Sequence, residues 1–187
     1  MKKAVVFLAD GLEEIEGLTV VDLLRRAGIE VTTVSIKEKD RTVTGSHGII
    51  IQADSCFETE DFSDKDLLVL PGGMPGTTNL GNHAGVVNQV MDFYRSGRMV
   101  AAICAAPTVF GQMGILKGRT AVCYPGLEGE LTGATVGAHE VEVSDNVTTS
   151  RGMGTAIPFA LSLVAQLSGQ EASDQLAKSI VYSGTRG

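Results

Sequence analysis

Cys104 lies between an apolar run expected to form a buried strand, Met99–Ile103, and a segment expected to be helical, Ala105–Gly111. Ala102 and Ala106 flank it two residues away on either side. A nucleophile on a sharp strand-to-helix turn needs small neighbours at those positions, because the backbone folds back on itself. The start of a helix also favours a thiolate, which lowers the thiol pKa. This pattern favours a reactive cysteine; the alternative is a buried thiol that packs as a small apolar side chain.

The other cysteines, Cys56 and Cys123, lack this context, and no two cysteines have Cys-x-x-Cys spacing. The set is therefore neither a disulfide framework nor a tetrahedral zinc site, and three free thiols suit a reducing compartment. The histidines are scattered along the chain at His47, His83 and His139. We predict no metal site from these spacings.

Two adjacent glycines, Gly72 and Gly73, follow a short apolar run, Leu67–Leu70, that we expect to be a buried strand. Adjacent glycines leave backbone N–H groups accessible and permit unusual φ values, as an oxyanion-binding loop requires. An ordinary tight turn uses the same residues. The pair is therefore a candidate for anion stabilisation beside Cys104.

Three glutamates open the first expected helix, 12–27. Carboxylates in a first turn usually complement the helix dipole, and this accounts for Glu13 and Glu14. The expected apolar stripe of the helix is Leu12, Ile15, Leu18, Val21 and Leu24. Glu16 lies off that stripe, so we expect it to point into the crevice at the strand ends. A partly buried carboxyl there is protonated more readily and can act as a general acid or base.

The elements that position these residues begin with strand, helix and strand at 3–9, 12–27 and 31–36, a unit that predicts a parallel sheet. Further strands are expected at 67–70, 99–103, 120–123, 140–143 and 147–150, a hairpin within 40–53, and helices at 84–96, 105–111, 155–167 and 172–180. The predicted fold class is α/β, a flavodoxin-like three-layer sandwich with a mostly parallel sheet and helices on both faces.

Composition limits the class of function. The chain has 187 residues, which suits one domain, and its net charge of −7 argues against nucleic-acid binding and against a polybasic membrane surface. Two long uncharged stretches, 99–116 and 153–170, each contain a proline and are better explained as buried elements. The N-terminal apolar run is too short for a signal-peptide core, so we expect a cytoplasmic protein.

Four segments together resemble the ThiJ/PfpI family, in the branch of the parkinsonism-associated deglycase and its bacterial relatives. They are GLEEIE at 11–16, LPGG at 70–73, AAICAAP at 101–107 and TSRGMGTAIPFAL at 149–161. The resemblance implies one ThiJ/PfpI domain, of the class I glutamine-amidotransferase-like kind, over 1–187. By the same resemblance Cys104 is the reactive cysteine and Glu16 its hydrogen-bond partner. Gly72 and Gly73 form the oxyanion loop, and Ala105 supplies a further backbone N–H.

Two positions depart from the family pattern. The intracellular-peptidase branch has a histidine directly after the cysteine, where this chain has Ala105, and the deglycase branch often has a histidine where this chain has Tyr124. Glu16 is then the expected acid and base. Tyr124 and Gly154 are candidates for the substrate pocket. The resemblance places Arg26, beside Asp22, near a dimer interface, and places His47 in a loop from which it would approach a partner subunit; both are further pocket candidates.

The resemblance implies an enzyme that acts on reactive dicarbonyls such as methylglyoxal, or on their early adducts with protein and nucleotide groups, and yields a hydroxy acid. No cofactor and no metal are expected, and a homodimer is. The alternative from a different class is an oxidative-stress sensor or chaperone that works through oxidation of Cys104. An intracellular cysteine peptidase comes third, because Ala105 removes the adjacent histidine that would activate its nucleophile.

Overall fold

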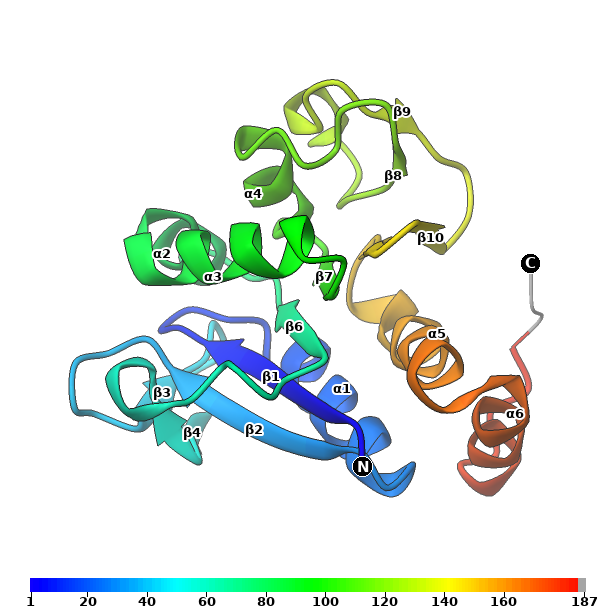
Figure 1. Ribbon diagram of the computed structural model, residues 1–187, viewed down its shortest axis with the longest axis horizontal. Helices are drawn as coiled ribbons and strands as arrows, with labels where there is room; N and C mark the ends of the chain where they lie inside the picture. Colours follow the sequence, from blue (N-terminus) through cyan, green and yellow to red (C-terminus); the bar gives the residue numbers. More distant parts are fainter. Residues whose placement is uncertain (185–187) are drawn as a thin grey trace.

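The computed structural model describes residues 1–184, and its centre is a seven-stranded sheet (Figure 1). In order across the sheet, the strands are β10 (Val141–Ser144), β11 (Val147–Ser150), β7 (Met99–Ile103), β6 (Leu67–Leu70), β1 (Lys3–Leu8), β2 (Glu30–Ser35) and β5 (Ser55–Cys56). Every neighbouring pair is parallel except β10 and β11. The predicted flavodoxin-like α/β fold is confirmed.

Helices cover both faces of this sheet (Figure 1). One face carries α1 (Glu14–Arg26), α5 (Ala156–Ser168) and α6 (Gln170–Ser179), and the other carries α2 (Gly76–Asn82), α3 (Ala84–Arg95) and α4 (Pro107–Gln112). Successive side chains of β1 alternate between the two cores: Val6 packs toward α1 and α5, and Phe7 packs toward α3. Since both faces are buried, the strand is apolar throughout rather than alternating.

The segments outside the main sheet depart most from the sequence prediction. The expected hairpin is present as β3 (Thr42–Thr44) paired antiparallel with β4 (Ile50–Gln52). The strand predicted at 120–123 is only β8 (Thr120–Ala121), and it pairs with an unpredicted strand, β9 (Thr135–Val136), in a sheet of its own. Helix α2 was also unpredicted. Single 3-10 turns occur at Phe57–Thr59, Glu128–Glu130 and Met153–Thr155.

The predicted apolar stripe of the first helix is wrong at its N-terminal end. Ile15 and Leu18 are 49% and 36% exposed, whereas Glu14 and Glu16 are buried. The buried face continues through residues Gly17, Val20, Val21, Leu23 and Leu24. The start of the helix lies against loops whose backbone N–H groups are bonded by neither helix nor strand. These donors need the carboxylates of Glu14 and Glu16 as acceptors, which an apolar side chain could not provide. No helix within residues 1–184 has the length and apolar character to span a membrane.

Candidate active site

Cys104 directly follows β7 and has a positive φ of 65°. Such a conformation is uncommon for a non-glycine residue and persists only where the surroundings impose it. Here both backbone groups are held: the N–H donates to Ser150 O at 3.0 Å, and the C=O accepts from Tyr124 N–H at 2.8 Å. Helix α4 begins three residues later at Pro107. The predicted sharp turn between strand and helix is therefore present.

Two backbone N–H groups, from Gly73 and Ala105, form hydrogen bonds with the Cys104 sulfur. Gly73 has a φ of 88°, which glycine adopts without a Cβ penalty. Gly72 has a different task, because its N–H donates to Glu16 Oε2 at 3.0 Å. Within the glycine pair, then, Gly73 faces the sulfur and Gly72 holds the carboxylate.

Glu16 is only 1% exposed and shares a side-chain hydrogen bond with Cys104. The pKa of Glu16 is raised to about 7, chiefly because the carboxyl is buried. The hydrogen bonds from Cys104 and Gly72 oppose this rise, and the charge of Glu13 adds to it. The carboxyl is therefore poised to take and return a proton near neutral pH.

The sequence prediction of a lowered thiol pKa is wrong for this arrangement. Burial, followed by the charge and hydrogen bond of Glu16, raises the pKa of Cys104 to about 12, and the N–H groups of Ala105 and Gly73 oppose that rise only in part. Two negative charges side by side in a buried site are costly. The thiol therefore keeps its proton at neutral pH.

The pocket beside Cys104 encloses about 480 Å³. It is lined by Glu13, Glu16, Gly73, Cys104, Tyr124, Pro125, Arg151, Gly152, Met153, Gly154 and Thr155. Tyr124 and Gly154, two of the candidates named from the sequence, are among these lining residues. Arg151 and Glu13 were not singled out, although Arg151 directly follows β11, whose carboxyl end opens on the pocket. A larger hollow of about 700 Å³, between α5, α6 and residues 138–141, contains none of the predicted site residues.

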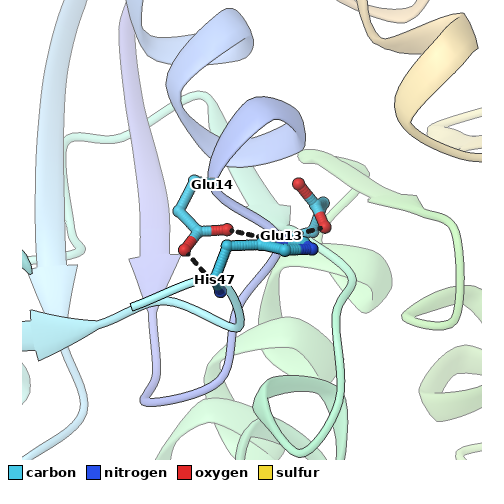
Figure 2. Close-up of side chains that lie close together, drawn as sticks. All are labelled: Glu13, Glu14 and His47. Atoms are coloured by element: carbon cyan, nitrogen blue, oxygen red, sulfur yellow. Dashed lines mark hydrogen bonds and ion pairs between the residues drawn. The ribbon is translucent and has the colours of Figure 1, made fainter. Parts of the chain in front are cut away.

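Two predicted pocket residues do not line the pocket of their own chain. Arg26 lies at the far end of α1, where its Nε binds Asp22 Oδ2 at 2.6 Å in an exposed ion pair. His47 lies in the β3–β4 loop, with its side chain 67% exposed. Its Nδ1 is 2.9 Å from Glu14 Oε2 and 3.4 Å from Glu13 Oε2 (Figure 2). Arg26 lies at the opposite end of α1 from Glu16, and His47 faces Glu13 and Glu14 at the start of α1 rather than the sulfur.

Glu14 clamps the β3–β4 loop to α1, a role that the helix-dipole interpretation missed. Its Oε1 accepts the N–H groups of His47 and Ile49 at 2.8 and 3.4 Å, and its Oε2 faces the His47 ring (Figure 2). Burial by itself would raise the pKa of Glu14, yet the hydrogen bonds from His47 and nearby N–H groups lower it to about 2. The pKa of His47 is raised in turn. Atoms of Glu13, Glu14 and His47 lie within 4.8 Å of one another, a set able to ligate a cation, but here both carboxylates face the His47 ring.

Comparison with known proteins places these features in a family. The model of the DJ-1/PfpI family matches residues 2–166. Protein DJ-1 homolog B of Arabidopsis thaliana is 38% identical over 182 residues, covering 96% of this chain but 41% of that protein's own length. The glutathione-independent glyoxalase DJR-1.2 of Caenorhabditis elegans is 32% identical, with 95% of each chain covered. The structure of oxidized Toxoplasma gondii DJ-1 has a TM-score of 0.94 at 34% identity, covering 98% of this chain and 100% of the other.

Proposed function

Because the chain belongs to the DJ-1/PfpI family and sets a buried carboxyl against a cysteine, we propose that it converts reactive dicarbonyls such as methylglyoxal to hydroxy acids. Early adducts of such dicarbonyls with protein or nucleotide groups are substrates of the same chemical kind. The observation that carries the proposal is the hydrogen bond between Glu16 and Cys104, together with the two N–H groups directed at the sulfur. The glyoxalase name of the worm relative supports it.

The first step is addition of sulfur to the aldehyde carbon. Glu16 accepts the thiol proton, Cys104 attacks the aldehyde carbon, and Glu16 returns the proton to the new alkoxide oxygen to give a neutral hemithioacetal. The N–H groups of Gly73 and Ala105 hold the oxygen that gains negative charge in the transition state. Because these donors already converge on the sulfur, a carbonyl oxygen bound there lies beside the nucleophile.

The second step moves a proton between two carbons. Glu16, again a carboxylate, removes the hydrogen of the former aldehyde carbon as a proton and delivers a proton to the neighbouring ketone carbon. The hydroxyl proton of the hemithioacetal passes to the ketone oxygen, which gives a thioester of the hydroxy acid. Water then hydrolyses the thioester and regenerates the thiol. In sum, CH₃COCHO and H₂O give lactate and H⁺, so the aldehyde carbon is oxidised and the ketone carbon reduced with no external oxidant. The pKa of about 7 at Glu16 suits both directions of proton transfer.

Methylglyoxal consumption with lactate detection tests this proposal. We expect Cys104→Ser and Glu16→Gln each to lose turnover by about 100-fold or more, because each removes a group that acts in the chemical steps. Cys56→Ser is the matched control, since Cys56 is a buried thiol on β5 outside the pocket. Full activity in the Cys104 variant would refute the proposal.

A second candidate, a redox sensor, is favoured by the same donors. The two N–H groups and a protonated Glu16 would also bind the oxygens of a sulfinate on Cys104. A related structure is described as oxidized. Brief peroxide exposure followed by peptide mass spectrometry should place oxidation first at Cys104, because Cys56 and Cys123 are buried. A variant that oxidises normally but turns over no dicarbonyl would favour the sensor.

We also propose a homodimer, in the reducing cytoplasm that three free thiols suit. Ile15 and Leu18 on α1, and Ile49 and Ile50 on the neighbouring hairpin, expose apolar side chains. Two-fold dimers are the commonest soluble assemblies, and burying these residues against a second copy would remove them from water. Light scattering at micromolar concentration should give about twice the 19.6 kDa chain mass. Ile50→Asp should shift it toward the monomer.

A further inference from the structure

The pocket is lined by an arginine whose guanidinium is paired with no carboxylate in residues 1–184. Its three charged lining residues are Glu13, Glu16 and Arg151. Both carboxylates are engaged, Glu13 with His47 and Glu16 with Cys104. Within the part of the chain that the structure describes, the guanidinium of Arg151 makes no ion pair, hydrogen bond or ring contact. Its charge is therefore available to a bound molecule.

The backbone fixes Arg151 relative to the nucleophile. The preceding residue, Ser150, accepts the Cys104 N–H at 3.0 Å, so the end of β11 is tied directly to the nucleophile's own backbone. The N–H of Arg151 donates to Thr155 Oγ1 at 3.2 Å, and that hydroxyl also lies 2.7 Å from Ser150 Oγ. The backbone of the arginine thus has a set position beside the pocket, and its side chain is exposed.

A guanidinium in this position favours the binding of negatively charged molecules. Its fork of N–H donors matches carboxylate and phosphate oxygens, and the protein as a whole, at −7, repels anions. A neutral dicarbonyl gains little from such a partner. We propose that Arg151 makes the pocket selective for carbonyl substrates that carry a carboxylate or phosphate. This inference rests on the dicarbonyl activity proposed above and names its substrate class.

The chemistry is unchanged for such a substrate. An anionic α-oxo aldehyde, OHC–CO–R⁻, takes up one water and gives ⁻OOC–CHOH–R⁻ and H⁺, with the aldehyde carbon oxidised and the ketone carbon reduced. The charged group R⁻ takes no part in bond making. It binds Arg151 in the ground state and the transition state alike, so its contribution is expected in KM.

Matched probes that differ in charge test the selectivity. 4,5-Dioxopentanoate is compared with its methyl ester, and hydroxypyruvaldehyde phosphate with hydroxypyruvaldehyde, so the two pairs separate carboxylate from phosphate. We expect wild-type kcat/KM to favour the anion of at least one pair. Arg151→Gln should lower that anion-to-neutral ratio about tenfold, as expected for loss of a charge-assisted hydrogen bond, mainly through KM. Arg151→Lys should retain part of it.

Arg95→Gln is the control, because it removes the same charge from the exposed last turn of α3, outside the pocket. It should leave the anion-to-neutral ratio at the wild-type value. The proposal is overturned if Arg151→Gln lowers kcat/KM equally for both members of each pair, or if Arg95→Gln changes the ratio as much.

Alkylation of Cys104 gives a readout that needs no turnover. Iodoacetate and iodoacetamide are similar in size and differ in charge, and both react with the same sulfur. Arg151→Gln should lower the ratio of the iodoacetate rate constant to the iodoacetamide rate constant at least fivefold, whereas Arg95→Gln should leave this ratio unchanged. If wild type turns over no dicarbonyl but the alkylation ratio falls in Arg151→Gln, the proposed reaction fails and anion recognition stands. An unchanged ratio overturns anion recognition whatever the enzyme activity.

Discussion

The backbone N–H of Gly72 donates a hydrogen bond to Glu16 Oε2 at 3.0 Å, in a place where no side chain fits. A Cβ on Gly72 would lie 2.5 Å from that oxygen and 2.5 Å from Cys104 Cβ. The glycine thus orients the carboxylate and at the same time leaves the space in which carboxylate and sulfur meet.

Gly72→Ala is therefore expected to lower methylglyoxal turnover by about 100-fold, because the added methyl must push the acid or the nucleophile out of position. Steady-state kinetics measure the effect. Gly129→Ala is the matched control: the added Cβ meets nothing within 4 Å there. Wild-type kinetics in Gly72→Ala would show that the Glu16–Cys104 spacing is not critical.

Glu16 should make the protein less stable as pH rises. Its pKa is 4.5 in the unfolded chain and about 7 in the folded one, so its stabilising contribution is complete below pH 4.5 and is lost as pH rises through 7. Glu16→Gln removes the buried charge. We expect the variant to be more stable than wild type by about 2–3 kcal/mol at pH 8 and equal to it at pH 4. Urea unfolding at both pH values measures this.

The exposed Glu58 provides the control for that experiment, since Glu58→Gln makes the same change in formula on the surface. At pH 8 it should change the stability far less than Glu16→Gln does, because an exposed side chain is hydrated in the folded and the unfolded chain alike. If Glu16→Gln behaves in the same way, the carboxyl is not held in an environment that resists its ionisation.

The same Glu16→Gln variant should have a more acidic thiol. After burial, the charge and hydrogen bond of Glu16 are the largest causes of the raised pKa of Cys104, and the amide carries no charge. The pH midpoint of iodoacetamide alkylation is expected to fall by at least one unit, while dicarbonyl turnover is lost. Cys104→Ala supplies the background from the other thiols. A midpoint that stays or rises would mean that Glu16 does not repel the thiolate.

Glu14→Ala should loosen the hairpin, because it leaves the His47 and Ile49 N–H groups without their buried acceptor. A loss of about 2–4 kcal/mol in the free energy of unfolding is expected at pH 7. The pKa of Glu14 is lowered from 4.5 to about 2, so its contribution is present above pH 4.5 and the difference between variant and wild type should shrink as pH falls through 2. Urea unfolding at several pH values measures it.

Hydrogen exchange locates that effect. Amides of residues 45–49 should exchange faster in Glu14→Ala, whereas Glu38→Ala, in the exposed turn before β3, should leave them unchanged. Uniform acceleration across the sheet would instead indicate a general loss of stability with no specific clamp.

Sequence patterns predicted what depends on short stretches of chain. Three such patterns lie within a few neighbouring residues: the apolar run of β1, the small residues around Cys104, and the pair Gly72 and Gly73. The structure contains the strand and the turns that these patterns predict. The different roles of Glu14 and Glu16 were harder to predict, because both are glutamates in the first turn of the same helix. What separates them is which distant backbone meets each carboxylate, the hairpin loop or Gly72, and no local pattern contains that pairing.

Arg151 and β9 escaped prediction for a related reason. The importance of Arg151 depends on its lining the pocket without an ion-pair partner among residues 1–184, which becomes visible only after the chain has folded. β9 is two exposed residues, Thr135–Val136, whose strand character comes from its partner β8.

The backbone hydrogen bonds of Cys104 also bear on when its conformation can form during synthesis. The conformation at φ 65° depends on acceptors and donors from Ser150 and Tyr124, which leave the ribosome well after the cysteine itself. Until those segments are made, neither backbone hydrogen bond of Cys104 can form, although Glu16 and Gly73 precede it in the chain. The conformation of Cys104 is therefore a property of the completed fold, because the partners of both its backbone hydrogen bonds lie on segments that follow it in the chain.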